Sequence, residues 1–132
     1  MLFGASLANA GVQAPKKPAP PARPVTTTSG VYTAAQAAKG EQTYMNMCVG
    51  CHPTGTYRAP AFKQKWEGAA LSRLFDFLSA TMPKNDPGSL EPEEYAQVIA
   101  YILKINGAPA GKTVLPADMA PLAKIRIAFP RR

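Results

Sequence analysis

The chain has 132 residues, including 14 prolines, and a formal net charge of +7. This length fits one domain with tails, and no apolar run reaches the ~18 residues that suggest a membrane span. No block of Lys and Arg is interleaved with aromatic residues, which argues against a nucleic-acid partner. The positive charge is either an ordinary solvated surface or a field that steers an acidic partner toward the protein.

The N-terminal part of the chain has two different compositions. Residues 1–10, MLFGASLANA, are fairly apolar, and Ala8-Asn9-Ala10 matches the small-x-small pattern of a signal cleavage site. Because the basic start of a signal is missing, we predict the remnant of an export signal, with an incidental apolar N-terminus as the alternative. Residues 11–30 are rich in Pro, Ala and Thr without periodicity. Such a segment cannot bury enough surface to offset its ordering entropy, so we expect an extended tether.

The folded domain is expected at residues 31–112, followed by a C-terminal extension, 113–132, that packs on the domain or trails from it. Its first element is a helix over residues 33–47, which contain good helix formers. Thr33 is the candidate N-cap of this helix. Residues 53–62 are expected to form a loop, because they contain three breakers: Pro53, Gly55 and Pro60.

Two amphipathic helices are predicted in the second half of the domain. The first covers residues 68–80 and has an apolar stripe at helical spacing: Leu71, Leu74, Phe75 and Leu78. The second begins at Pro92, although Glu91 is a poor cap, and ends near Asn106-Gly107. Its stripe comprises Tyr95, Val98, Ile99, Ile102 and Leu103. After Gly107 we expect mostly loop with one short turn near residues 118–124. No stretch alternates convincingly as a strand does, so the predicted fold class is all-α.

Both cysteines and the only histidine lie in one motif, Cys48-Val49-Gly50-Cys51-His52. Two thiols at this spacing can reach the two vinyl groups at one haem edge, and the adjacent imidazole can then bind the iron. A thioredoxin-like dithiol would follow a strand rather than a helix. A structural zinc ion needs four ligands, and a disulfide across two residues would leave His52 unexplained. The motif therefore predicts one haem c, attached through Cys48 and Cys51, with His52 on the iron.

These features together resemble a class I, mono-haem c-type cytochrome of the bacterial periplasmic kind, over about residues 31–128. The resemblance is carried by the motif together with Gly40, Tyr44, Pro60, Met82-Pro83 and the closing helix around Tyr101. It implies the cytochrome c fold, in which a few short helices wrap one haem. It also implies that the first helix crosses the last, so that Gly40 and Tyr44 meet Ala100 and Tyr101. This packing would explain a mid-helix glycine that is otherwise only tolerated.

The second axial ligand of the iron is predicted to be a methionine, because the chain has no second histidine. Met82 follows an amphipathic helix, lies in a loop and precedes a proline, as the ligand methionine does in many relatives. Met45 and Met47 lie on the helix that leads into Cys48, so we expect them on the wrong side. Met82 and His52 would form the usual pair of a cytochrome c. The alternative is a methionine that fills a gap in the core.

Contacts around the haem are predicted with less direct support. The family implies that a proline carbonyl after the motif accepts the free N–H of His52, and Pro60 is the candidate. Trp66, Arg58 and Tyr57 are candidates for contacts with the haem propionates, with a plain core position as the alternative for Trp66. Three lysines are candidates for ringing the exposed haem edge: Lys63, Lys65 and Lys84.

The predicted function is a periplasmic, exported electron carrier and not an enzyme. It would pass single electrons between redox proteins, such as a dehydrogenase, an oxidase or another cytochrome, that dock near the haem edge. The alternative is a permanent haem c subunit of a periplasmic dehydrogenase, with residues 11–30 or 113–132 as its docking arm. A third possibility, an enzyme or gas sensor with an open iron, requires that Met82 not bind.

Overall fold

The computed structural model describes residue 4 and residues 9–131; the remaining positions, most of the predicted signal remnant among them, lie outside the described residues. In the described part the chain forms six α-helices, one 3-10 turn and two very short strands. The helices are α1 (Ala34–Met47), α2 (Thr54–Arg58), α3 (Pro60–Trp66), α4 (Leu71–Thr81), α5 (Pro92–Ile105) and α6 (Met119–Leu122). The strands are β1 (Val25–Thr26) and β2 (Ile125–Arg126). The predicted all-α class is confirmed. None of the helices seen in residues 9–131 is long and apolar enough to cross a membrane.

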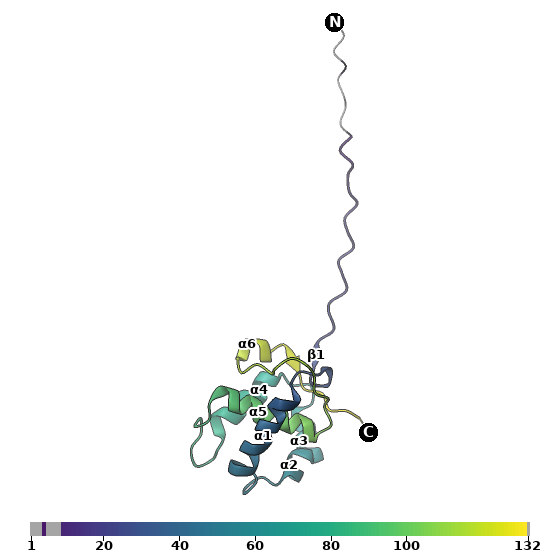
Figure 1. Ribbon diagram of the computed structural model, residues 1–132. Coiled ribbons are helices and arrows are strands. Elements are labelled where there is room, and N and C mark those ends of the chain that lie inside the picture. The colour runs from purple at the N-terminus through teal and green to yellow at the C-terminus, as the bar shows by residue number, and fades with distance from the viewer. Residues whose placement is uncertain (1–3, 5–8, 132) are drawn as a thin grey trace.

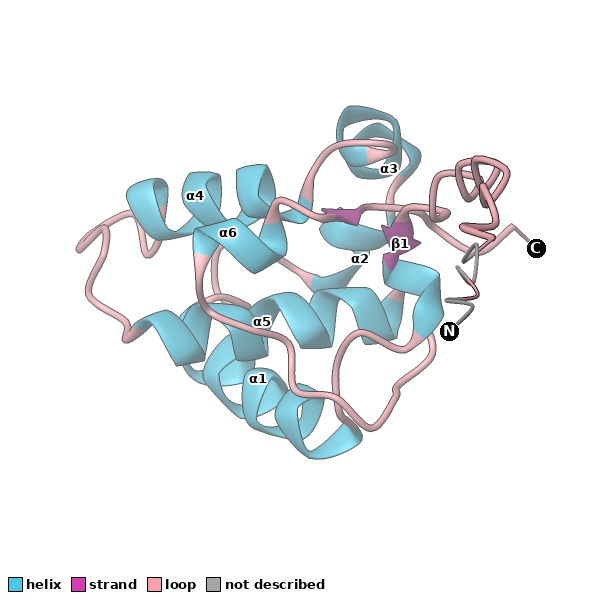
Figure 2. Ribbon diagram, turned by 90° about the horizontal axis from the view of Figure 1, so that it is seen from above, coloured by secondary structure: helices cyan, strands magenta, loops and turns pink. Residues whose placement is uncertain are grey.

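Helix α5 forms the middle layer of the domain. Figure 2 shows it between α1 on one side and α4 with α6 on the other. Both predicted apolar stripes are buried, with every stripe residue of α4 and α5 at most 7% exposed. The Glu94 carboxylate accepts a hydrogen bond from the Glu91 N–H (2.9 Å) at the start of α5. Gly107, in the left-handed region at φ +84°, follows its end. The predicted bounds of α5 are therefore confirmed.

Helix α1 begins and ends as its sequence predicts. The Thr33 hydroxyl accepts a hydrogen bond from the Gln36 N–H (3.1 Å), which confirms the N-cap. At the other end, the Cys48 N–H donates to the Tyr44 carbonyl (2.8 Å), so the helix runs directly into the cysteine motif. The packing of α1 therefore fixes where the motif lies.

The crossing of α1 over α5 depends on Gly40. A Cβ at this position would lie 1.8 Å from the Gln97 carbonyl oxygen, so only glycine allows the two backbones to approach this closely. One turn further along α1, the rings of Tyr44 and Tyr101 lie 5.2 Å apart. The predicted meeting of Tyr44 with Tyr101 is confirmed, whereas Gly40 meets Gln97, one turn before the predicted Ala100.

The predicted loop at residues 53–62 is wrong, because this stretch contains all of α2 and the first turn of α3. Pro60 is the first residue of α3, a position where its missing N–H has no partner in any helix. Likewise, Pro53 lies just before α2 and Gly55 inside it. Two of the three supposed breakers thus mark helix starts.

Helix α4 begins at Leu71 rather than at residue 68. The backbone just before it is bonded elsewhere: the Gly68 N–H donates to the Ile127 carbonyl (2.8 Å), and the Ile127 N–H donates to the Ala69 carbonyl (2.8 Å). These bonds to the C-terminal segment hold residues 68–70 in a turn and a bridge outside the helix, which no local sequence signal indicated.

The segments at both ends of the domain pack on it together. β1 pairs in parallel with β2, and the fully buried Thr27 hydroxyl both donates to the Ala128 carbonyl (2.7 Å) and accepts from its N–H (2.9 Å). Contacts with the domain thus begin at Val25, inside the predicted tether. The tether was predicted from composition, which does not show that residues 25 and 26 pair with a distant strand. Residues 9–24 extend away from the domain (Figure 1).

The segment after residue 112 also joins the core. The Gln36 side chain makes two hydrogen bonds with the backbone of Leu115, donating to its carbonyl (2.9 Å) and accepting from its N–H (2.8 Å). Four apolar side chains of this segment are buried: Leu115, Leu122, Ile125 and Ile127. The C-terminal segment is therefore part of the folded domain, and the predicted short turn is present as α6.

Candidate functional site

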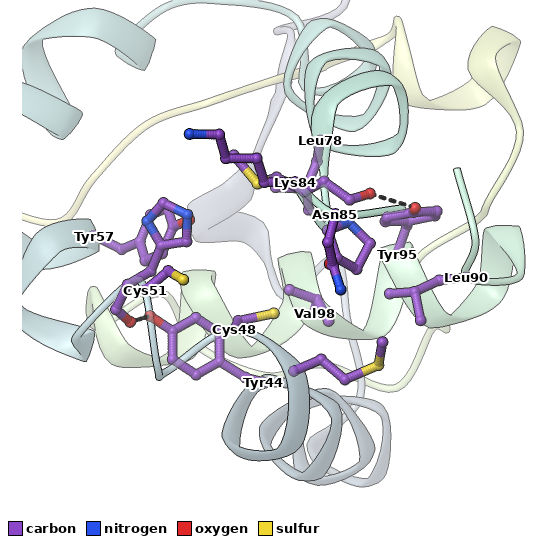
Figure 3. A pocket seen from close by; sticks show the side chains of 14 residues that line it. Tyr44, Cys48, Cys51, Tyr57, Leu78, Lys84, Asn85, Leu90, Tyr95 and Val98 are labelled. Atoms are coloured by element: carbon purple, nitrogen blue, oxygen red, sulfur yellow. Dashed lines mark hydrogen bonds between the residues drawn. The ribbon is translucent and has the colours of Figure 1, made fainter. Parts of the chain in front are cut away.

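A cavity of about 580 Å³ lies between the cysteine motif and the loop that follows α4. Its volume falls within the range of cofactor-binding sites. Figure 3 shows Cys48 and Cys51 across the cavity from Leu78, Lys84 and Asn85. The lining residues are Tyr44, Met47, Cys48, Cys51, His52, Tyr57, Leu78, Met82, Pro83, Lys84, Asn85, Leu90, Tyr95 and Val98. The cavity thus gathers the two cysteines and the histidine of the motif together with Met82, the predicted second ligand.

The motif is a tight turn at the end of α1. The N–H groups of Cys51 and His52 both donate to the Cys48 carbonyl, at 3.2 and 2.8 Å. This turn places both thiols and the imidazole on one wall of the cavity. Both cysteines are free thiols, Cys48 half-buried and Cys51 exposed. Burial raises the pKa of the Cys48 thiol, so this sulfur stays protonated at neutral pH in the haem-free chain.

Two tyrosines hold His52. The buried Tyr44 hydroxyl donates a hydrogen bond to the His52 carbonyl, and the Tyr57 ring lies 5.7 Å from the imidazole ring. Burial, followed by the charges of Tyr57 and Cys48, raises the pKa of Tyr44, so its hydroxyl remains a donor. Pro60 lies outside the cavity lining, at the start of α3, and its contact with His52 stays a prediction.

Met82 lies directly after α4, where the helix ends. Its N–H donates to the Leu78 carbonyl (2.9 Å), and its carbonyl accepts from the Tyr95 hydroxyl (2.6 Å), shown dashed in Figure 3. Met82 is half-buried and lines the cavity. Both hydrogen bonds that fix Met82 are made by its backbone. Its thioether side chain takes part in neither of them.

The predicted propionate contacts divide between the cavity and other places. Tyr57 lines the cavity, but Arg58 lines a different one. Trp66 is buried against Phe77, with ring centroids 5.6 Å apart, which matches the alternative of a core ring. The lysines are also dispersed, because only Lys84 lines this cavity. Lys63 lines the other cavity, and the Lys65 ammonium lies over the Trp66 ring (5.3 Å), so the three do not form one ring.

Some lining residues were missed by the sequence argument. Met47, expected on the wrong side, lines the cavity because it is the last residue of α1, where the chain turns into the motif. Tyr95 and Val98 belong to the apolar stripe of α5, which signals burial but not which buried side chains face a cofactor. Asn85 lies in a turn-rich loop and carried no signal.

The family follows from comparison with known sequences. A sequence model of the family described as "Cytochrome C oxidase, cbb3-type, subunit III" matches residues 35–102, just over half of the chain. The chain belongs to this family of c-type cytochromes. The match runs from α1 through the motif and α4 into α5, so it covers both walls of the cavity. No curated protein and no solved structure matches the chain.

Membership of a c-type cytochrome family implies haem c and electron transfer based on it. The cavity fits such a group, because two thiols, an imidazole and a thioether line one space whose other walls are largely apolar. Within residues 9–131, no group of three or more His, Cys, Asp or Glu side chains is placed to bind a metal ion.

Proposed function

We propose that this c-type cytochrome is an exported, periplasmic carrier of single electrons whose haem is held by Cys48, Cys51, His52 and Met82. The observation that carries the proposal is that these four side chains line the same cavity, although Met82 comes from a different element. When bound, the haem iron supplies reversible one-electron exchange. The proposed export rests on the Ala8-Asn9-Ala10 pattern and on the covalent attachment motif.

The chain's own residues have separable roles in this proposal. Cys48 and Cys51 would fix the position of the haem, and His52 would bind its iron from a backbone held by Tyr44. The apolar side chains of Leu78, Leu90 and Val98 line the cavity and would contact the haem in place of water. A haem shielded from water needs little solvent reorganisation when the charge of the iron changes, which suits a carrier.

Met82 decides between a carrier and an open, reactive iron. A thioether is a soft ligand that favours the reduced metal and so raises the potential. The Tyr95 hydroxyl bonds the Met82 carbonyl and keeps this part of the loop at the cavity. If His52 and Met82 both held the iron, the protein would leave it no open position for oxygen or a substrate, which separates this proposal from an enzyme or a gas sensor.

The alternative, a permanent haem c subunit of a periplasmic dehydrogenase, is favoured by one observation. Residues 9–24 make no contact with the domain and carry Lys16, Lys17 and Arg23, so this tether is free to bind another subunit. The segment after residue 112 is packed into the core instead. If a docking arm exists, it is therefore the tether.

The haem site is tested by producing the protein together with a haem-attachment system and recording optical spectra with a pyridine haemochrome assay. We expect one covalent haem, weakened attachment in Cys48→Ala, and an open ferric iron in Met82→Ala. Met119→Ala is the matched control, because Met119 is exposed and lies outside the cavity. An unchanged spectrum and potential in Met82→Ala would exclude Met82 as the ligand, and absence of covalent haem would overturn the proposal.

Carrier and subunit are separated by purification from the native cells. A free carrier elutes alone, whereas a subunit elutes with a partner in fixed stoichiometry. Deleting residues 11–24 should release the protein from such a partner if the tether is the docking arm. Retention of the partner after this deletion would exclude the tether from that role.

A further inference from the structure

A second cavity, of about 520 Å³, lies beside the haem cavity and is lined by basic residues. Helix α2 borders both: Tyr57 lines the haem cavity, and the next residue, Arg58, lines the second. The second cavity has four cationic residues and no acidic one in its lining: Arg58, Lys63, Lys104 and Arg131. We name it the basic pocket.

The described part of the chain supplies little negative charge to compensate the basic pocket. Lys104 lies 3.9 Å from the Glu41 carboxylate, but both side chains are about half exposed, and such pairs contribute little. Within residues 9–131, no acidic side chain lies within salt-bridge distance of the other three. Uncompensated positive charge at a concave surface attracts anionic groups and accelerates their association.

The basic pocket is separated from the predicted haem ligand by one residue. Asn106 lines the pocket and donates a hydrogen bond from its amide to the Tyr57 carbonyl (2.9 Å). The Tyr57 ring in turn lies 5.7 Å from the His52 ring. Tyr57 therefore links His52, through its ring, to the Asn106 side chain that lines the pocket, through its carbonyl.

A row of aromatic rings makes a second connection between His52 and the basic pocket. The Tyr57 ring lies 5.1 Å from the Phe62 ring, which lies 6.0 Å from the Phe129 ring. Phe129 directly precedes Pro130 and Arg131, which line the basic pocket. A series of neighbouring aromatic rings thus runs from His52 through Tyr57 and Phe62 to Phe129, next to the residues that line this surface.

We propose that the basic pocket is a docking surface for an acidic patch on a redox protein, at which the electron passes by way of Tyr57 and His52. This inference rests on the proposed haem site. The bound haem would supply one-electron exchange with a one-electron centre of the partner, in either direction, and no bond would form or break. The surface is distinct from the Lys84 side of the cavity, so a donor and an acceptor can bind at separate places.

The charge of the pocket argues for an acidic protein rather than an apolar or cationic partner. Four cationic residues spread over α2, α3, α5 and the C-terminal segment match a patch of several carboxylates. A small inorganic anion would be the competing occupant, because its charge alone would satisfy the same residues. If the pocket binds an acidic protein surface, an acidic peptide should compete for it. If it binds only a small anion, phosphate should compete and the peptide should not.

The test follows oxidation of the reduced, haem-loaded protein by hexacyanoferrate(III), an anionic one-electron oxidant, in a stopped-flow instrument. The test variant is Arg58→Glu/Lys63→Glu. The matched control is Lys39→Glu/Lys112→Glu, which changes the net charge equally at exposed lysines outside both cavities. At ~10 mM ionic strength we expect at least a fivefold greater rate loss in the test variant than in the control, and the difference should vanish near 1 M salt.

A hexaglutamate peptide then distinguishes the occupants. It should slow oxidation of the wild type but not of Arg58→Glu/Lys63→Glu, whereas inorganic phosphate at equal charge should have a smaller effect. Equal rate losses in both double variants, a larger loss in Lys84→Glu alone, or competition by phosphate but not by the peptide would each overturn the docking surface. Failure of the haem site itself is recognised separately, because the protein would then show no covalent haem and no reducible spectrum.

Discussion

Replacing Gly40 by alanine should destabilise the protein by much more than its helical position suggests. In an exposed helix this change gains up to ~1 kcal/mol. Here the new Cβ would lie 1.8 Å from the Gln97 carbonyl oxygen and 2.4 Å from its carbon, both backbone atoms of α5 that cannot rotate away. Helices α1 and α5 would have to separate, loosening the core between them. We expect the free energy of unfolding to fall by about 2 kcal/mol or more, the cost of overpacking exceeding the helical gain.

Urea denaturation of the haem-loaded protein, followed by circular dichroism, measures this loss. Gly55→Ala is the matched control, because Gly55 also lies in a helix but a Cβ there would meet no atom within 4 Å. We expect this control to be neutral or stabilised by up to ~1 kcal/mol. If Gly40→Ala were as stable as the wild type, the close approach of α1 and α5 would be refuted.

Three further predictions concern single hydrogen-bonding side chains. Tyr95→Phe removes the bond to the Met82 carbonyl, so added imidazole should displace the methionine more easily, by about 1 kcal/mol; an unchanged imidazole titration would contradict this. Gln36→Ala leaves two backbone groups of the buried Leu115 unpaired, so urea should unfold the variant with a loss of about 2 kcal/mol and a protease should cut near Leu115 faster; equal protection would refute this. Burial raises the pKa of Tyr32, so the folded state keeps this proton to higher pH than the unfolded chain. Its contribution to stability is complete below about pH 10 and falls as pH rises further, and Tyr32→Phe should flatten this alkaline fall, measured as unfolding free energy against pH. A parallel fall in both proteins would count against it.

The elements that the sequence predicted well are those with local signals. Thr33 caps α1 through its own hydroxyl, and Pro92 and Gly107 mark the bounds of α5 by their backbone restrictions. The same residue types misled at residues 53–62, because Pro60 breaks a helix only from its interior and not at its first position. Local signals therefore located helix ends more reliably than they located loops.

The candidate site likewise has parts that local sequence signals predicted and parts that they did not. Cys48, Cys51 and His52 are adjacent in sequence, so their shared wall of the cavity follows from one turn. The positions of Trp66 and Arg58 depend instead on how α2 and α3 pack, which no spacing in the sequence specifies. The basic pocket is a stronger example, since its lining comes from four separate segments of the chain.

The pairing of the segment around Thr27 with the segment around Ala128 affects the order in which parts of the chain can fold during synthesis. The bonds of Thr27 to Ala128 join positions 101 residues apart, and such distant contacts form late because closing a long loop costs entropy. A chain made from its N-terminus presents Cys48, Cys51 and His52 well before β2 exists. The thiols thus remain accessible in an open chain during the interval in which haem has to reach them. A chain stopped before Ile125 should still acquire haem, detectable by haem staining, but should not form a stable domain.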